Sequence, residues 1–204
     1  MGAALTQLIP ISELAPGAAG AIRNQVISAL LALASKELTM PEEKLVVRDL
    51  RPVEDLALYS TGTTVSTIND WLFTTAATTV TGFVAINNVA TAMADQRYVA
   101  IYGVKDLRMA YGTKQAAAAT IVAGCQAVSL IKINVGGGDK AIWDLSKLQA
   151  YPEQIVGITP GGVIIPQNAS YTISLYKSQG TASMVTAIVL EGVVVEPRGK
   201  TTSP

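Results

Sequence analysis

The chain has 204 residues, and its 15 Lys and Arg residues balance 15 Asp and Glu residues to give a formal net charge of zero. A chain without net charge lacks the long-range field that attracts nucleic acid or anionic membranes, so direct nucleic-acid binding is disfavoured. There is no His, and Cys125 is the single Cys. These counts exclude imidazole-dependent catalysis, His metal sites and an internal disulfide.

The N-terminal part of the sequence predicts an arm followed by one amphipathic helix. Residues 1–16 are apolar but irregular, because Pro10 and Pro16 interrupt any helix. Between residues 17 and 36, apolar side chains recur at the spacing of a helical stripe. Two interpretations stay open: the stripe contacts a neighbouring subunit, or the helix lies on its own domain. The candidate subunit-contact residues are Ile22, Val26, Leu30 and Leu33.

After Lys44 the apolar residues alternate with polar ones, which predicts β-strands. In the segment 170–177, for example, Tyr171, Ile173 and Leu175 would share one face of a strand. Burial on one face only is typical of antiparallel sheets. The predicted strand segments are 45–51, 71–75, 78–86, 97–104, 127–135, 140–145, 154–158, 163–165, 170–177 and 186–195.

Turn residues divide these strands and complete the fold prediction. The run 136–139 (GGGD) predicts a hairpin tip, whereas 159–162 (TPGG) and 166–168 (PQN) predict strand ends. Roughly eight to ten short strands predict a mainly β protein with an antiparallel two-sheet β-sandwich of jelly-roll type. We expect an N-terminal arm and helix over residues 1–43, the β-sandwich over 44–197 and a flexible tail over 198–204.

No catalytic motif stands out. The ending Gly199-Lys200-Thr201 is not a phosphate-binding loop, because Val194 occupies the position where such a loop needs a glycine. Paired carboxylates can hydrolyse glycosides without His, yet the sequence marks no pair as buried together. We therefore expect no catalytic residue, no cofactor and no metal, and a protein that is not an enzyme.

Mean hydropathy is high, at +0.37, so membrane-spanning segments need consideration. Three uncharged stretches approach the required length, at 71–94, 115–131 and 154–176. Each is interrupted by Thr and Asn, by Gln and Ser, or by Pro, so we expect no membrane span.

Aromatic residues suggest an alternative function. They could form a carbohydrate-binding platform, as in a β-sandwich adhesion or glycan-binding module, or they could be core residues. The residues concerned are Trp71, Tyr98, Tyr102, Trp143 and Tyr171.

The charged fraction of 15% leaves few charges to cover the surface, which favours a subunit that buries much of itself against neighbours. The run ITPGGVIIPQNASYTISLYKSQGTASMVTAIVLEGVVVEP (158–197) resembles the closing strands of viral jelly-roll capsid and capsid-cementing proteins, and RYVAIYGVKDLRMAY (97–111) resembles a mid-barrel strand of that group. This resemblance implies a structural bacteriophage virion protein that forms or cements an icosahedral shell. Its partners would be copies of itself and other capsid proteins, and it would reside in the virion after assembly in the host cytoplasm.

Overall fold

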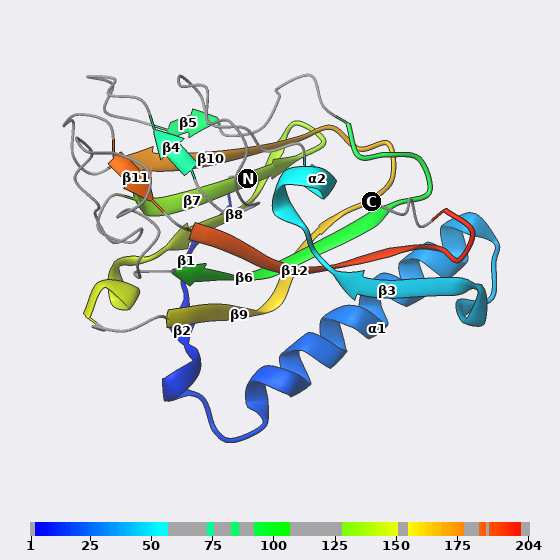
Figure 1. Cartoon of the computed structure of the whole chain (residues 1–204), viewed down its shortest axis with the longest axis horizontal. Coiled ribbons are helices and arrows are strands. Elements are labelled where there is room, and N and C mark those ends of the chain that lie inside the picture. Colours follow the sequence, from blue (N-terminus) through cyan, green and yellow to red (C-terminus); the bar gives the residue numbers. More distant parts are fainter. Residues whose placement is uncertain are drawn as a thin grey trace.

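Two five-stranded β-sheets and one long helix make up most of the described structure (Figure 1). The computed structural model describes residues 3–56, 73–75, 83–85, 92–106, 128–150, 155–177, 184–186 and 188–200. The first sheet, here called the β7 sheet, contains in spatial order β1 (Leu5–Gln7), β8 (Gly138–Asp144), β7 (Val128–Val135), β10 (Tyr171–Lys177) and β5 (Phe83–Ala85). The second, the β6 sheet, contains β2 (Ile9–Pro10), β9 (Ile155–Ile165), β6 (Tyr98–Asp106), β12 (Ile188–Pro197) and β3 (Leu45–Asp49).

The remaining elements are short, apart from the N-terminal helix. A two-stranded sheet pairs β4 (Phe73–Thr75) with β11 (Met184–Thr186). The helices are α1 (Ala18–Leu38) and α2 (Pro52–Leu56), and the 3-10 turns are η1 (Ile11–Glu13), η2 (Glu42–Lys44) and η4 (Ser146–Ala150). The predicted helix is therefore confirmed as α1.

Strand pairing in the two sheets is nested. The hairpin β7–β8 is innermost, and β6–β9, β5–β10 and β3–β12 pair outside it, all antiparallel. The antiparallel pairs β6–β12 and β7–β10 then complete the two sheets. Only the arm departs from this pattern, since β1 pairs parallel with β8 while β2 pairs antiparallel with β9. The prediction of antiparallel sheets is confirmed.

The main hydrophobic core lies between the two sheets. Tyr171, Ile173 and Leu175 of β10 are buried there, as the sequence alternation predicts. Trp143 of β8 is 1% exposed and is the largest fully buried side chain among the described residues. The facing side chains from the β6 sheet include Val99, Ile101, Val104, Val163, Ile165, Leu190 and Val194.

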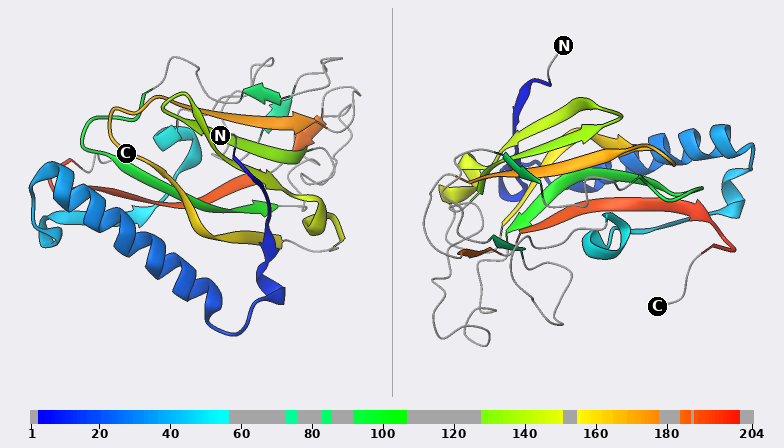
Figure 2. Two further views of the ribbon diagram at one scale, coloured as in Figure 1. Left: turned by 180° about the vertical axis from the view of Figure 1, so that it is seen from behind. Right: turned by 90° about the horizontal axis from the view of Figure 1, so that it is seen from above.

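A second core lies on the opposite side of the β6 sheet, because α1 packs against that side (Figure 2). In β6, Val99 and Ile101 face the core between the sheets, whereas Tyr98, Ala100 and Tyr102 face α1. The one-face burial expected for alternating strands such as 170–177 therefore does not extend to β6. The helix removes the outer face from water, so apolar side chains are favourable on both sides.

Glycines at turns behave in two ways. Gly136 and Gly137 form the predicted β7–β8 hairpin tip and have φ values of +63° and +79°. The prediction that 159–162 ends a strand is wrong, because β9 continues from Ile155 to Ile165. Gly161 and Gly162 have φ values of +89° and +54°, so the chain can bulge outward and then resume pairing with β6.

Gly192, at the bulge in β12, offers a test of close backbone packing. A Cβ atom at this position would lie 2.5 Å from the Ala100 carbonyl oxygen and 2.8 Å from Leu50. We expect Gly192→Ala to lower the free energy of unfolding by about 1–3 kcal/mol, because backbone must shift to accept it. Gly20→Ala in α1 is the control, since nothing lies within 4 Å of its Cβ and we expect stability to stay equal or rise. Urea denaturation measures both; equal effects would contradict the close packing.

The ends of the predicted domains are attached to the sandwich. The arm contributes β1 and β2 to the two sheets. At the other end, the Arg198 N–H donates to the Lys44 carbonyl over 2.9 Å, and Lys200 Nζ contacts the Asp95 carbonyl over 3.1 Å. The first residues of the predicted flexible tail are thus held in place. Cys125 and Trp71 lie outside the described residues.

Candidate functional site

The four candidate subunit-contact residues lie on α1, and the structure divides them into two pairs. Val26 is 3% exposed and Leu30 is fully buried, both against the chain's own β6 sheet. Ile22 and Leu33 are half-buried at the margin of the same core. Val26 and Leu30 therefore follow the alternative interpretation, a helix on its own domain. A contact of Ile22 or Leu33 with a neighbouring subunit stays a prediction.

Polar contacts fix both ends of α1 to the β6 sheet. Near the N-terminal end, Arg23 Nη2 lies 2.9 Å from Asp49 Oδ1 of β3. Near the C-terminal end, the hydroxyl of the buried Tyr98 donates to Glu37 Oε2 over 2.9 Å. Burial, together with this bond, raises the pKa of Tyr98, so the hydroxyl keeps its proton. These contacts add two polar links to the apolar packing of the helix on the strands.

Beside the Arg23 contact, Glu191 of β12 is partly withdrawn from water. Burial raises the pKa of Glu191, and nearby Asp49 raises it further, while Lys105 and Arg23 oppose the shift. Burial also raises the pKa of the neighbouring Tyr102, with Glu191 as the second cause. The carboxylates of Asp49 and Glu191, the cations of Arg23 and Lys105 and the phenol of Tyr102 thus interact near the N-terminal end of α1.

Glu191 should make stability depend on pH. Its ordinary pKa is 4.5, and above that value the unfolded chain releases a proton that the folded chain still holds. The free energy of unfolding therefore falls as the pH rises from 4.5 through the raised pKa. We expect Glu191→Gln to reduce this fall and to raise stability at neutral pH. Urea denaturation at a series of pH values checks this, with exposed Glu43→Gln as control; equal pH profiles for both variants would exclude the effect.

The N-terminal arm joins the two sheets at their adjacent edges. Leu8, between β1 and β2, is fully buried in the core between the sheets. The Leu8 N–H donates to the Asp144 carbonyl over 3.2 Å, and Lys147 forms an ion pair with Glu13. Leu5 and Ile11 nevertheless stay 60% and 41% exposed. The arm therefore presents apolar side chains to the outside while being held in place.

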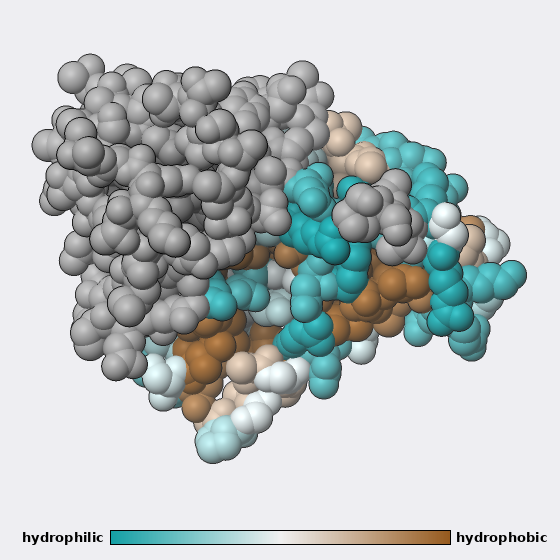
Figure 3. Space-filling model, in the orientation of Figure 1, coloured by the Kyte–Doolittle hydropathy of each residue, from teal (hydrophilic) through white to brown (hydrophobic). Residues whose placement is uncertain are grey.

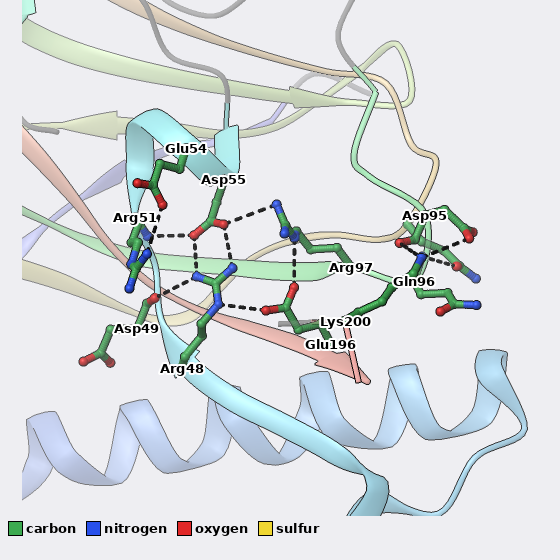
Figure 4. Close-up of polar contacts among 11 residues, drawn as sticks. Arg48, Asp49, Arg51, Glu54, Asp55, Asp95, Gln96, Arg97, Glu196 and Lys200 are labelled. Atoms are coloured by element: carbon green, nitrogen blue, oxygen red, sulfur yellow. Dashed lines mark hydrogen bonds and ion pairs between the residues drawn. The ribbon is translucent and has the colours of Figure 1, made fainter. Parts of the chain in front are cut away.

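A four-charge network joins side chains of α2, β3 and β12 (Figure 4). Arg48 forms two 2.7 Å bonds to Asp55, from Nη1 to Oδ2 and from Nη2 to Oδ1. Arg48 Nε also donates to Glu196 Oε1 over 2.9 Å. Arg97 completes the network with Nε 3.1 Å from Glu196 Oε2 and Nη1 3.3 Å from Asp55 Oδ1. The network carries two positive and two negative charges.

The carboxylates of this network are buried, with side-chain exposures of 2% for Asp55 and 3% for Glu196. Each of their four oxygen atoms accepts from an arginine, and the Arg51 N–H adds a 2.8 Å bond to Asp55. The bond to Asp55 raises the pKa of Arg48, which stays charged. A carboxylate with both oxygens held by guanidinium groups serves poorly as a general base or nucleophile. The network instead connects α2 to the β6 sheet.

Sequence reasoning missed most of this network. It did not single out Arg48, Arg97 or Glu196. A signal was present, because Glu196 directly follows the fully buried Val193–Val195 on β12. A charge that continues an apolar strand needs a partner of opposite sign.

The aromatic residues proposed as a glycan platform are mostly core. Trp143, Tyr98, Tyr102 and Tyr171 are all buried. Burial raises the pKa of Tyr171 to about 12. A stacking platform needs an exposed ring face, so these four residues do not supply one.

Comparison with known proteins found no matching family, no matching curated protein and no matching solved structure. Within the described ranges, no group of three or more Cys, Asp or Glu residues is placed to hold a metal ion. One described helix, α1, is long and apolar enough to cross a membrane by length and composition. In this structure it packs on the β6 sheet.

Proposed function

We propose that the protein is a structural component of a virion, which forms or cements an icosahedral capsid through contacts between subunits and performs no catalysis. The shell would belong to a bacteriophage, with copies of this chain and other capsid proteins as partners. The protein would be assembled in the host cytoplasm and retained in the virion.

Strand order carries this proposal. Counting only β3, β5, β6, β7, β8, β9, β10 and β12, the first strand pairs with the eighth, the second with the seventh, the third with the sixth and the fourth with the fifth. This is a single long hairpin rolled into two sheets, with spatial orders 1-8-3-6 and 2-7-4-5. We infer that the sandwich is a jelly roll, the architecture of many viral capsid proteins.

Other jelly-roll proteins include lectins and cupins, so further observations have to separate the classes. The chain has no His, the commonest protein ligand for transition metals. Four of the five aromatic residues considered for glycan binding are buried. The low charge and the exposed Leu5 and Ile11 of the arm favour protein contacts instead.

Self-association tests the proposal. We expect the purified full chain to sediment as an oligomer in velocity ultracentrifugation, and negative-stain electron microscopy to show rings, sheets or closed shells. A protein that stays monomeric up to its highest soluble concentration, alone and with purified capsids of its phage, would contradict it. Glycan-array binding by that monomer would favour the adhesion alternative.

A further inference from the structure

The two five-stranded sheets have four edge strands, and β3 is the longest of them as described. β1 and β5 have three residues each, and β2 has two and ends at Pro10. β3 has five residues, Leu45–Asp49, and includes no proline or lysine. Natural proteins usually protect such an edge, because its unpaired backbone groups can pair with another strand.

The backbone bonds around β3 show which residues face outward from the sheet. The Leu50 N–H donates to the Gly192 carbonyl over 3.0 Å, and the Lys44 carbonyl accepts from the Arg198 N–H over 2.9 Å. Even-numbered residues therefore direct their backbone groups to β12. Because these groups alternate along a strand, Leu45, Val47 and Asp49 direct theirs away from the sheet.

Two of the six outward groups already have partners. The Leu45 N–H donates to the Glu42 carbonyl, and the Asp49 carbonyl accepts a 3.3 Å bond from Arg48 Nη1. Within the described part of the chain, no partner is recorded for the other four. They are the Leu45 carbonyl, the Val47 N–H, the Val47 carbonyl and the Asp49 N–H.

We propose that β3 pairs antiparallel with β3 of a second copy of this chain, with Val47 on the two-fold axis. The four open groups are self-complementary in this register. The two Val47 residues exchange two hydrogen bonds, and each Asp49 N–H donates to the Leu45 carbonyl of the other copy. The Leu45 N–H and the Asp49 carbonyl, which already have partners in their own chain, lie at the two ends of the paired segment and are not used in this register. The two β6 sheets become one ten-stranded sheet.

Side chains are compatible with this register. It sets Val46 opposite Arg48 of the other copy, and the guanidinium of Arg48 already faces Asp55 and Glu196 of its own chain. Asp49, the other charged residue of β3, forms an ion pair with Arg23 of its own chain, so neither charge is unpaired in the contact. Figure 3 shows hydrophobic surface where β3 lies in Figure 1. This inference rests on the self-association in the proposed function and names the surface that mediates it.

Proline at position 47 tests the pairing. The Val47 N–H makes no bond to β12, so Val47→Pro removes an outward donor and leaves the β3–β12 ladder intact. We expect self-association to weaken about 25-fold or more, at about fivefold for each of the two lost hydrogen bonds. Val47→Thr is the matched control, because it keeps both the N–H and a β-branched side chain. Sedimentation velocity measures association, and circular dichroism confirms folding.

Cross-linking gives a second measurement that does not depend on the proline variant folding. In a Cys125→Ser background, Val47→Cys should form covalent dimers with a short bis-maleimide. The exposed Glu43→Cys should form few, because residue 43 lies four positions from the two-fold axis in each copy, beyond the reach of the reagent. Oligomers that persist in folded Val47→Pro, or no Val47→Cys dimers, would overturn the pairing and leave self-association standing. A monomeric parent protein would overturn both proposals.

Discussion

Replacing Asp55 with Asn should lower the free energy of unfolding by about 3–5 kcal/mol, the usual cost of removing one partner from a buried ion pair. The reason is that Asp55 is 2% exposed and binds both Arg48 and Arg97. Asn keeps the size of the side chain and removes its charge. Arg48 and Arg97 would then share Glu196 alone, with an excess positive charge that water reaches poorly.

The neighbouring residue provides the control for this prediction. Glu54 lies on the same short helix and forms a 3.1 Å ion pair with Arg51, but its side chain is 54% exposed. We expect Glu54→Gln to change stability by less than about 1 kcal/mol, as is usual for surface pairs. Urea denaturation of both variants at neutral pH decides the matter. If Asp55→Asn lowered the free energy of unfolding as little as Glu54→Gln does, the network would be accessible to water and would contribute little.

The fold was predictable from the sequence where a local pattern decides the structure. The alternation of Tyr171, Ile173 and Leu175 placed one strand and its buried face, and glycines at 136 and 137 placed a hairpin. The helix was visible from the period of Val26 and Leu30. In each case, residues adjacent in sequence determine the outcome.

Other features depend on pairs far apart in sequence, and local patterns do not encode them. Arg48 and Glu196 are 148 residues apart, and they meet only because β3 and β12 are the first and last strands of a nested set. The continuation of β9 past Thr159 depends on β6 lying beside it. The open edge at Val47 likewise follows from strand order, since a sequence does not reveal which strand lies outermost.

The packing of α1 also bears on whether its apolar stripe covers the chain's own domain or contacts a neighbouring subunit. Leu30 is the residue that tests this. Leu30 is fully buried between α1 and the β6 sheet. We expect Leu30→Ala to lower the free energy of unfolding by about 2–5 kcal/mol, as for other buried leucines. Leu33→Ala is the matched control on the same helix. Leu33 is only half-buried, so its truncation should lower the free energy of unfolding less.

The two interpretations of the helix then differ in one measurement. If the helix covers its own domain, Leu30→Ala lowers the urea midpoint of the chain at every protein concentration, and Leu33→Ala lowers it by a smaller amount. If the stripe docks on a neighbour, Leu30→Ala leaves the unfolding of the dissociated subunit unchanged and raises the concentration at which oligomers form. Urea denaturation and sedimentation velocity on the same two variants therefore separate a helix that completes the fold from one that joins subunits.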